Sequence, residues 1–211
     1  MVRRSIKEGK EYVLKTAREH NVKFIQFLCT DVLGFLKGFA ITVEELEGAL
    51  DHGMGFDGSS IEGFARIDES DMVALPDPDT FRVLPGKLRE QHAIARVFCD
   101  VQRPGGEPFE GDPRNVLKRN LEQAANLGYT FYVGPELEFF YFRDDKGTEK
   151  LDEGSYFGMI PLDEYTTLRK ETVLTLEEMG IGIEYSHHEV APGQHEIDMR
   201  YTDALTMADN V

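Results

Sequence analysis

Hydrophobic and polar positions follow two different periods in the first part of the chain. Residues 5–19 repeat apolar side chains at helical spacing, which predicts an amphipathic helix. The two segments that follow, 22–29 and 35–41, alternate apolar and polar residues as strands do, with a turn at 31–34 between them. The pattern therefore predicts a helix followed by a β-hairpin.

The pattern then changes to a short helix, a glycine-rich stretch and more strands. Thr42 and Glu45 have the spacing of a capping box, which predicts a helix through Leu50. Residues 51–64 (DHGMGFDGSSIEGF) hold so many glycines that we expect no regular structure there. Two further short strands are predicted, at residues 72–81 and 92–101. Together these elements predict a small α+β domain over residues 1–103.

After the linker-like segment RPGGEP, a second domain is predicted over residues 104–211. Asp112 caps an expected helix that ends at Gly128. Residues 129–142 predict one strand or two, with a break at Gly134–Pro135. Beyond these we expect a helix over 163–179, two strands around the turn at Pro192–Gly193, and a helix from Thr202.

Composition narrows the classes of function. The 211 residues carry a formal net charge of -16, which repels nucleic acid, so we expect no nucleic-acid partner. No apolar run approaches bilayer length, and the start of the chain lacks the apolar core of a secretory signal, so we expect no membrane partner. Cys29 and Cys99 lie in apolar, strand-like segments, which fits two buried thiols in a reducing cytoplasm.

Two glutamates lie inside an aromatic run, GPELEFFYF at residues 134–142. Because side chains two apart in a strand point to the same face, we expect Glu136 and Glu138 to share one face and Leu137 and Phe139 the other. Neighbouring carboxylates repel each other and lose hydration against aromatic rings. Such a pair persists if both groups reach solvent, or if a cation lies between them.

A second carboxylate pair is expected in EVAPGQHE. If Pro192–Gly193 is a two-residue loop, Glu189 faces Glu196 with Cβ atoms roughly 5 Å apart. A longer loop or a bulge would shift this register, because Pro-Gly is not the preferred two-residue hairpin turn. Two close pairs suggest a hard divalent cation, Mg²⁺ or Mn²⁺, that shares its other positions with substrate phosphates. The alternative is that each pair is a solvated strand face.

Other polar residues allow a functional and a structural interpretation. His187 and His188 precede Glu189 and are either ligands or phosphate contacts, or hydrogen-bonded structural histidines. The loop GFDGSSIEGF crowds polar side chains among glycines, and alone it would be a surface turn. It lacks the Gly-Lys-Ser/Thr ending of a P-loop and the dinucleotide-binding glycine pattern.

Four longer segments together resemble one known family. FDGSSIEGFARIDESDM, GPELEFF, GSYFGMIPLD and EYSHHEVAPGQHEID are similar to blocks of glutamine synthetase, in its bacterial and archaeal type I form, and follow the same order. The resemblance implies an α+β fold. Residues 1–103 would be a β-grasp domain, and 104–211 the first part of the α/β catalytic domain, whose antiparallel strands line a funnel.

The resemblance also implies an activity with its metals. Glutamine synthetases condense glutamate with ammonia at the expense of ATP, through γ-glutamyl phosphate, and use Mg²⁺ or Mn²⁺. By motif position, Glu138, Glu189 and Glu196 would hold the metal near the glutamate and ammonium sites. Glu136 would hold a second metal on the nucleotide phosphates, and Glu184 would contact the nucleotide.

Three more residues match the ammonium site of the family. Asp57 would bind ammonium and take its proton, since a carboxylate both attracts the cation and accepts a proton. Ser60 and Tyr156 match further residues of that site. A related γ-glutamyl ligase acting on amines is the first alternative, and the presence of all three residues favours ammonia over it.

Chain length is where the sequence departs from the family. Family chains are twice as long and assemble in the cytoplasm as homo-oligomers, dodecamers of two stacked hexamers. The remaining ligands of the second metal and the glutamate-binding loop would lie in the missing part, so we expect the chain alone to be inactive. A second alternative is a non-catalytic homologue, a metal-binding structural or regulatory protein.

Overall fold

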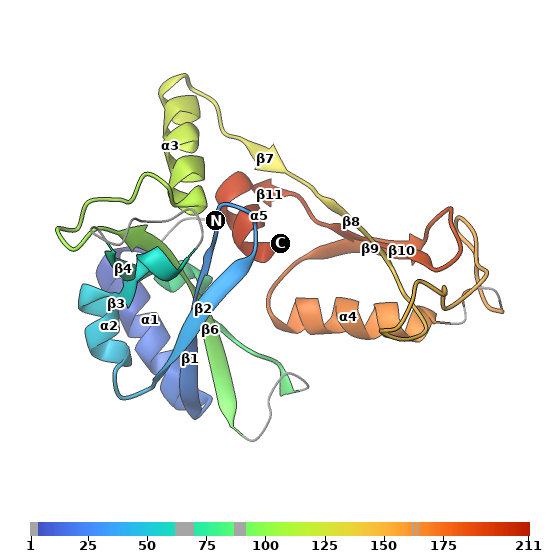
Figure 1. Cartoon of the computed structure of the whole chain (residues 1–211), viewed down its shortest axis with the longest axis horizontal. Coiled ribbons are helices and arrows are strands. Elements are labelled where there is room, and N and C mark those ends of the chain that lie inside the picture. Colours follow the sequence, from blue (N-terminus) through green and yellow to red (C-terminus); the bar gives the residue numbers. More distant parts are fainter. Residues whose placement is uncertain (1–3, 62–69, 87–91, 162, 164) are drawn as a thin grey trace. The chain divides into compact units, whose positions relative to one another are not determined.

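The computed structural model describes residues 4–61, 70–86, 92–161, 163 and 165–211. The chain forms two compact units, Met1–Phe131 and Tyr132–Val211 (Figure 1). The predicted division between residues 103 and 104 stays a prediction; by contacts, the helix that follows it belongs with the first unit. Among the described residues, no helix has both the length and the apolar character needed to cross a membrane.

A six-stranded sheet forms the first unit. Its strands lie in the order β2 (Leu36–Thr42), β1 (Val22–Thr30), β6 (Ala93–Gln102), β4 (Asp71–Pro76) and β3 (Met54–Asp57), and β5 (Arg82–Val83) also pairs with β6. Strands β1 and β6 run parallel, and the other pairs are antiparallel. The predicted hairpin is confirmed as the β1–β2 pair.

Two helices bury their apolar faces against this sheet. α1 (Ile6–Glu19) begins at a capping box, in which Ser5 Oγ accepts from the Glu8 N–H and the Glu8 carboxylate accepts from the Ser5 N–H. Its Val13 side chain is fully buried in the core that the sheet and α2 (Leu46–His52) share. The helical spacing of the first segment therefore reports a real core-facing stripe.

Two predictions about the following segment are wrong. Thr42 is the last residue of β2 and caps no helix, and α2 instead begins after Glu45. The glycine-rich stretch contains β3, which pairs with β4 from Met54 opposite Ala74 to Asp57 opposite Asp71. Ladder hydrogen bonds to β4 satisfy one side of the backbone of β3, which is an edge strand, so sheet pairing overrides its poor local propensity.

A buried cap fixes helix α3 (Pro113–Asn126) to the sheet. Asp112 is fully buried, and its two carboxylate oxygens accept from the N–H groups of Arg114 and Val101, both at 3.0 Å. Phe109, just before it, packs into a small core cluster with Val101. The predicted cap at Asp112 is confirmed, and the same carboxylate also binds the first unit's sheet.

The second unit is built on a three-stranded antiparallel sheet in the order β8 (Glu136–Phe140), β10 (Gln194–Met199), β9 (Ile183–His188). Helix α4 (Thr166–Glu178) packs along one face of it, where a second core forms (Figure 1). A short pair, β7 (Tyr132–Val133) with β11 (Thr202–Asp203), is followed by α5 (Ala204–Asn210). The second core therefore lies on the α4 side of the three-stranded sheet.

Helix starts in the second unit differ from prediction. α4 begins at Thr166, and Asp163 instead pairs its buried carboxylate with Arg169. Thr202 belongs to β11, and α5 begins after Asp203, whose carboxylate accepts from a backbone N–H of the first turn. The predicted break at Gly134–Pro135 is confirmed, because it separates β7 from β8.

Candidate functional site

Strand β8 sorts its side chains as predicted. Glu136 and Glu138 are exposed on one face, while Leu137 and Phe139 on the other pack into the core beneath. The shared face of the two glutamates is therefore confirmed. The aromatic neighbours anchor the strand, and the carboxylates point away from that anchor.

Strand β10 adds two carboxylates to the same face. Glu196 lies opposite Glu138, and Asp198 lies opposite Glu136. Directly opposed side chains have Cβ atoms about 5 Å apart, a separation at which like charges destabilise a sheet. These four residues define what we call the acidic face. A cation bound between them would turn repulsion into attraction.

The predicted facing of Glu189 and Glu196 is wrong. The Glu189 N–H donates to the Gln194 carbonyl at 2.8 Å, so the loop spans residues 190–193, and His187 lies opposite Glu196. Backbone register alone would separate the two glutamates. Their side chains nevertheless flank one imidazole, since Oε1 of Glu189 lies 3.8 Å from Nδ1 of His187 and Oε2 of Glu196 lies 3.5 Å from its Nε2. Glu189 therefore joins the edge of the acidic face.

Asp198 was not predicted as a site residue from the sequence, and His187 was left with two interpretations, functional and structural. Nε2 of His187 lies 3.5 Å from Oε2 of Glu196 and 3.9 Å from Oδ2 of Asp198, so these three residues form a possible cation-binding group. Oδ2 of Asp198 is buried and has no hydrogen-bond partner among the described residues. The signal for Asp198 was present in the sequence, since it follows Glu196 by two positions in a strand.

Burial and charge act together on this face. Burial first, then the neighbouring Asp198 and Glu189, and then the charge of Glu136, raise the pKa of Glu196 to about 8. The charge of Asp198, followed by burial and the charge of Glu136, raises the pKa of the Tyr185 phenol. The donors are carboxylate oxygens with one imidazole, a set that fits Mg²⁺ or Mn²⁺.

Tyr156 lies next to a histidine of the site, whereas Glu184 lies at an irregular position of the β9–β10 ladder. The rings of Tyr156 and His187 have centroids 5.4 Å apart and lie nearly perpendicular. The next residue, Phe157, donates its N–H to the His188 carbonyl at 3.0 Å, which holds this loop against the end of β9. Glu184 is exposed at the register irregularity of the β9–β10 ladder. Tyr156 is thus brought beside the site.

Asp57 and Ser60 lie together in the first unit, whereas the glutamates lie in the second. The exposed Asp57 carboxylate accepts from Ser59 N–H at 2.9 Å, Ser59 Oγ at 2.6 Å and Ser60 Oγ at 3.2 Å. The hydrogen bonds from Ser59, more than that from Ser60, lower the pKa of Asp57. This carboxylate is ionised and oriented, and so is suited to attracting a cation.

Comparison with known proteins gives two successive matches along the chain. Residues 21–104 match the β-grasp domain of glutamine synthetase, and residues 110–211 match its catalytic domain. The glutamine synthetase of Mycolicibacterium smegmatis is 53% identical over 207 residues, covering 96% of this chain and 46% of that protein. The one of Methanosarcina mazei is 51% identical over 206 residues, with 96% and 46% covered.

A solved structure agrees as well. The cryo-EM structure of Plasmodium falciparum glutamine synthetase superposes with a TM-score of 0.83 at 27% identity, covering 98% of this chain and 46% of that one. The chain therefore spans less than half the length of the relatives it matches. The predicted fold, a β-grasp domain followed by the start of the catalytic domain, is confirmed. With both of its parts matched in order, the chain belongs to the glutamine synthetase family.

Proposed function

We propose that the complete protein carrying this chain forms glutamine from glutamate, ammonium and ATP. The observation that carries the proposal is the acidic face, in which Glu138 opposes Glu196 and Glu136 opposes Asp198, within the segment that matches the catalytic domain of the family. Such a face repels itself without a cation and suits chemistry in which phosphates must be held. The family also leads us to expect a cytoplasmic homo-oligomer of two stacked hexamers.

The glutamates take the metal roles in this proposal. Glu138, Glu189 and Glu196 would hold one Mg²⁺ or Mn²⁺, and Glu136 would hold a second beside the nucleotide phosphates. Glu184 would contact the nucleotide. Bound there, the ions would offset the negative charge that collects on oxygens during phosphoryl transfer.

Asp57 is the proposed ammonium residue, with Ser60 and Tyr156 beside the same substrate. Its hydrogen bonds to Ser59 and Ser60 orient the carboxylate and lower its pKa. A lowered pKa keeps Asp57 ionised, so that it can attract the ammonium cation, and weakens it as a base. Capture and orientation of the cation are thus the parts of its role that the local geometry favours most.

The proposal is tested by the products of the complete purified protein. With glutamate, ATP and ammonium we expect glutamine and ADP in equal amounts, and slower turnover when methylamine replaces ammonium. Faster turnover with methylamine would identify an amine ligase instead. Failure to release ADP with either amine would favour the non-catalytic alternative.

Cation binding is expected to release a proton near neutral pH. Because the pKa of Glu196 is about 8 in the ion-free protein, this carboxyl is mostly protonated at pH 7 and must lose its proton to become a ligand. The apparent affinity for Mg²⁺ should therefore increase as the pH is raised towards 8 and decrease as the pH is lowered from it. Calorimetry in buffers of different ionisation enthalpy would measure about one proton released per ion. A pH-independent affinity with no proton release would contradict the prediction.

A further inference from the structure

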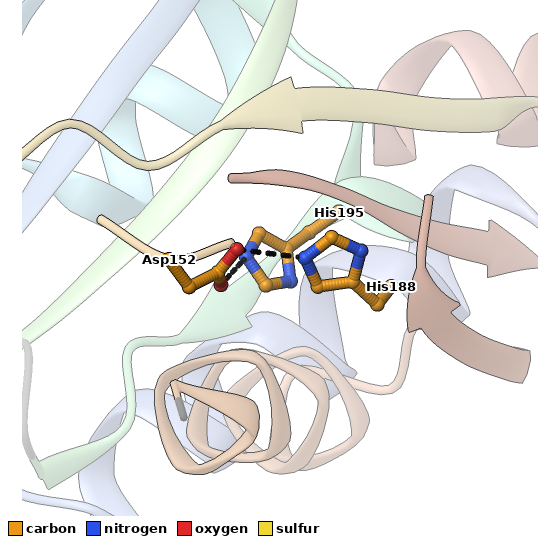
Figure 2. Close-up of side chains that lie close together, drawn as sticks. All are labelled: Asp152, His188 and His195. Atoms are coloured by element: carbon orange, nitrogen blue, oxygen red, sulfur yellow. Dashed lines mark hydrogen bonds and ion pairs between the residues drawn. The ribbon is translucent and has the colours of Figure 1, made fainter. Parts of the chain in front are cut away.

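A buried polar cluster lies on the opposite side of the same sheet. The side chains of Asp152, His188 and His195 are fully buried and converge from a loop, the end of β9 and the start of β10 (Figure 2). Dashed lines in Figure 2 join the carboxylate to both imidazoles. One carboxylate and two imidazoles within 4.8 Å of each other have the composition of a transition-metal site.

His195 has no lone pair directed at such a metal. Nη1 of Arg169 lies 2.5 Å from its Nδ1, and a guanidinium can only donate, so Nδ1 accepts and the ring proton resides on Nε2. That Nε2 faces Oδ2 of Asp152 at 3.3 Å, too poorly aligned to count as a hydrogen bond. Burial and then the charge of Arg169 lower the pKa of His195, which keeps the ring neutral.

His188, by contrast, makes hydrogen bonds at both nitrogens. Its Nδ1 donates to the Glu189 carbonyl at 2.7 Å, and its Nε2 lies 2.8 Å from Oδ1 of Asp152. Oδ1 also accepts from the N–H groups of Gly193 at 2.8 Å and Gly154 at 3.2 Å. Burial raises the pKa of Asp152, but these hydrogen bonds outweigh it, so the pKa is lowered and Oδ1 is an acceptor throughout.

The cluster is therefore a hydrogen-bonded clamp, in which Asp152 joins the two ends of one loop. Asp152 binds the turn at Gly193 and the end of β9 at His188, the two ends of the loop between Glu189 and Glu196. The approach is close, since a Cβ on Gly154 would lie 2.3 Å from Nε2 of His188. A fixed loop end sets where the neighbouring glutamates point.

We propose that Asp152 is a positioning residue, which fixes the loop at residues 190–193 so that Glu189 and Glu196 reach the cation with Glu138. This inference rests on the proposed function. In this arrangement the buried cluster beneath the acidic face orients the metal ligands without itself contacting the ion. Loss of such a partner typically reduces metal affinity ~10–100-fold.

The test is Asp152→Asn in the complete enzyme, with Mn²⁺ affinity measured by calorimetry and folding by urea unfolding. Asparagine keeps the shape but has one acceptor oxygen in place of two and no charge, so its N–H₂ group must face either the donors at the Oδ1 position or the Nε2–H of His195. Mn²⁺ affinity should therefore fall ~10–100-fold. The matched control is Asp144→Asn. Asp144 also accepts a backbone N–H, from Lys146, but on an exposed loop, so this variant should bind as the parent does. A folded Asp152→Asn variant with unchanged affinity would overturn the proposal.

A second pair of variants decides the matter if Asp152→Asn does not fold. His188→Gln retains a donor towards Asp152, whereas His188→Leu removes it. The glutamine variant should bind Mn²⁺ more tightly than the leucine variant, and equal affinities would overturn the proposal. One equivalent of a tightly held transition metal, lost on Asp152→Asn, would also overturn it and assign a metal site instead. If Glu138→Ala also left Mn²⁺ affinity unchanged, the failure would lie in the proposed function.

Discussion

Glu138→Ala is expected to reduce Mg²⁺ or Mn²⁺ affinity by more than the ~100-fold upper range of outer-shell changes, and to abolish glutamine formation by the complete enzyme. The side chain is exposed on the acidic face, so its loss opens no cavity. Its contact to protein, a hydrogen bond from Gln194 Nε2 at 2.6 Å, can be replaced by water. Stability should thus stay within about 0.5 kcal/mol of the parent.

The control for this variant removes the same charge elsewhere in the second unit. Glu178 is exposed on α4, which packs on the opposite face of the sheet, so Glu178→Ala should leave metal affinity and activity unchanged. Calorimetry with Mn²⁺ and thermal unfolding would be run on both variants. Equal affinities in Glu138→Ala, Glu178→Ala and the parent would remove Glu138 from the metal site.

A mixture of two inactive full-length variants, Asp57→Ala and Glu138→Ala, is expected to recover about a quarter of parental activity after joint unfolding and reassembly. Asp57 lies in the first unit and Glu138 in the second. If a ring of subunits joins the first unit of one chain to the second unit of its neighbour, one interface in four combines two intact residues. If each chain serves itself, the mixture stays inactive.

A second mixture, with both substitutions in one chain, distinguishes the same two arrangements. The double variant Asp57→Ala/Glu138→Ala, reassembled with an equal amount of parent, should show about a quarter of parental activity for sites shared between neighbours and about half for sites within one chain. Native mass spectrometry would verify that mixed rings form. Mixed rings with half activity here and none in the first mixture would place Asp57 in its own chain's site.

Features set by local rules could be predicted from the sequence, and those set by register could not. Glu136 and Glu138 share a face because strand alternation is local, and Asp112 caps α3 because the cap lies next to its helix. The facing of Glu189 and Glu196 failed because it depended on a loop length that Pro-Gly does not fix. Asp198 was missed although the same alternation placed it beside Glu196.

Tertiary pairing accounts for the remaining differences. Thr42 has capping-box spacing, yet it extends β2 because a partner strand is in place. The glycine-rich segment forms β3 because β4 satisfies its backbone. The clamp around Asp152 could not be anticipated at all, since its members come from three separate segments and meet only after the sheet has formed.

The buried cap of α3 determines where this protein can be cut. The β-grasp match ends at residue 104, but a piece ending there would lack Asp112 and Phe109. The Val101 N–H would then lose its acceptor within the protein, and the apolar cluster around it would open to water. A self-sufficient N-terminal piece for isolated study therefore has to extend through α3 to Asn126.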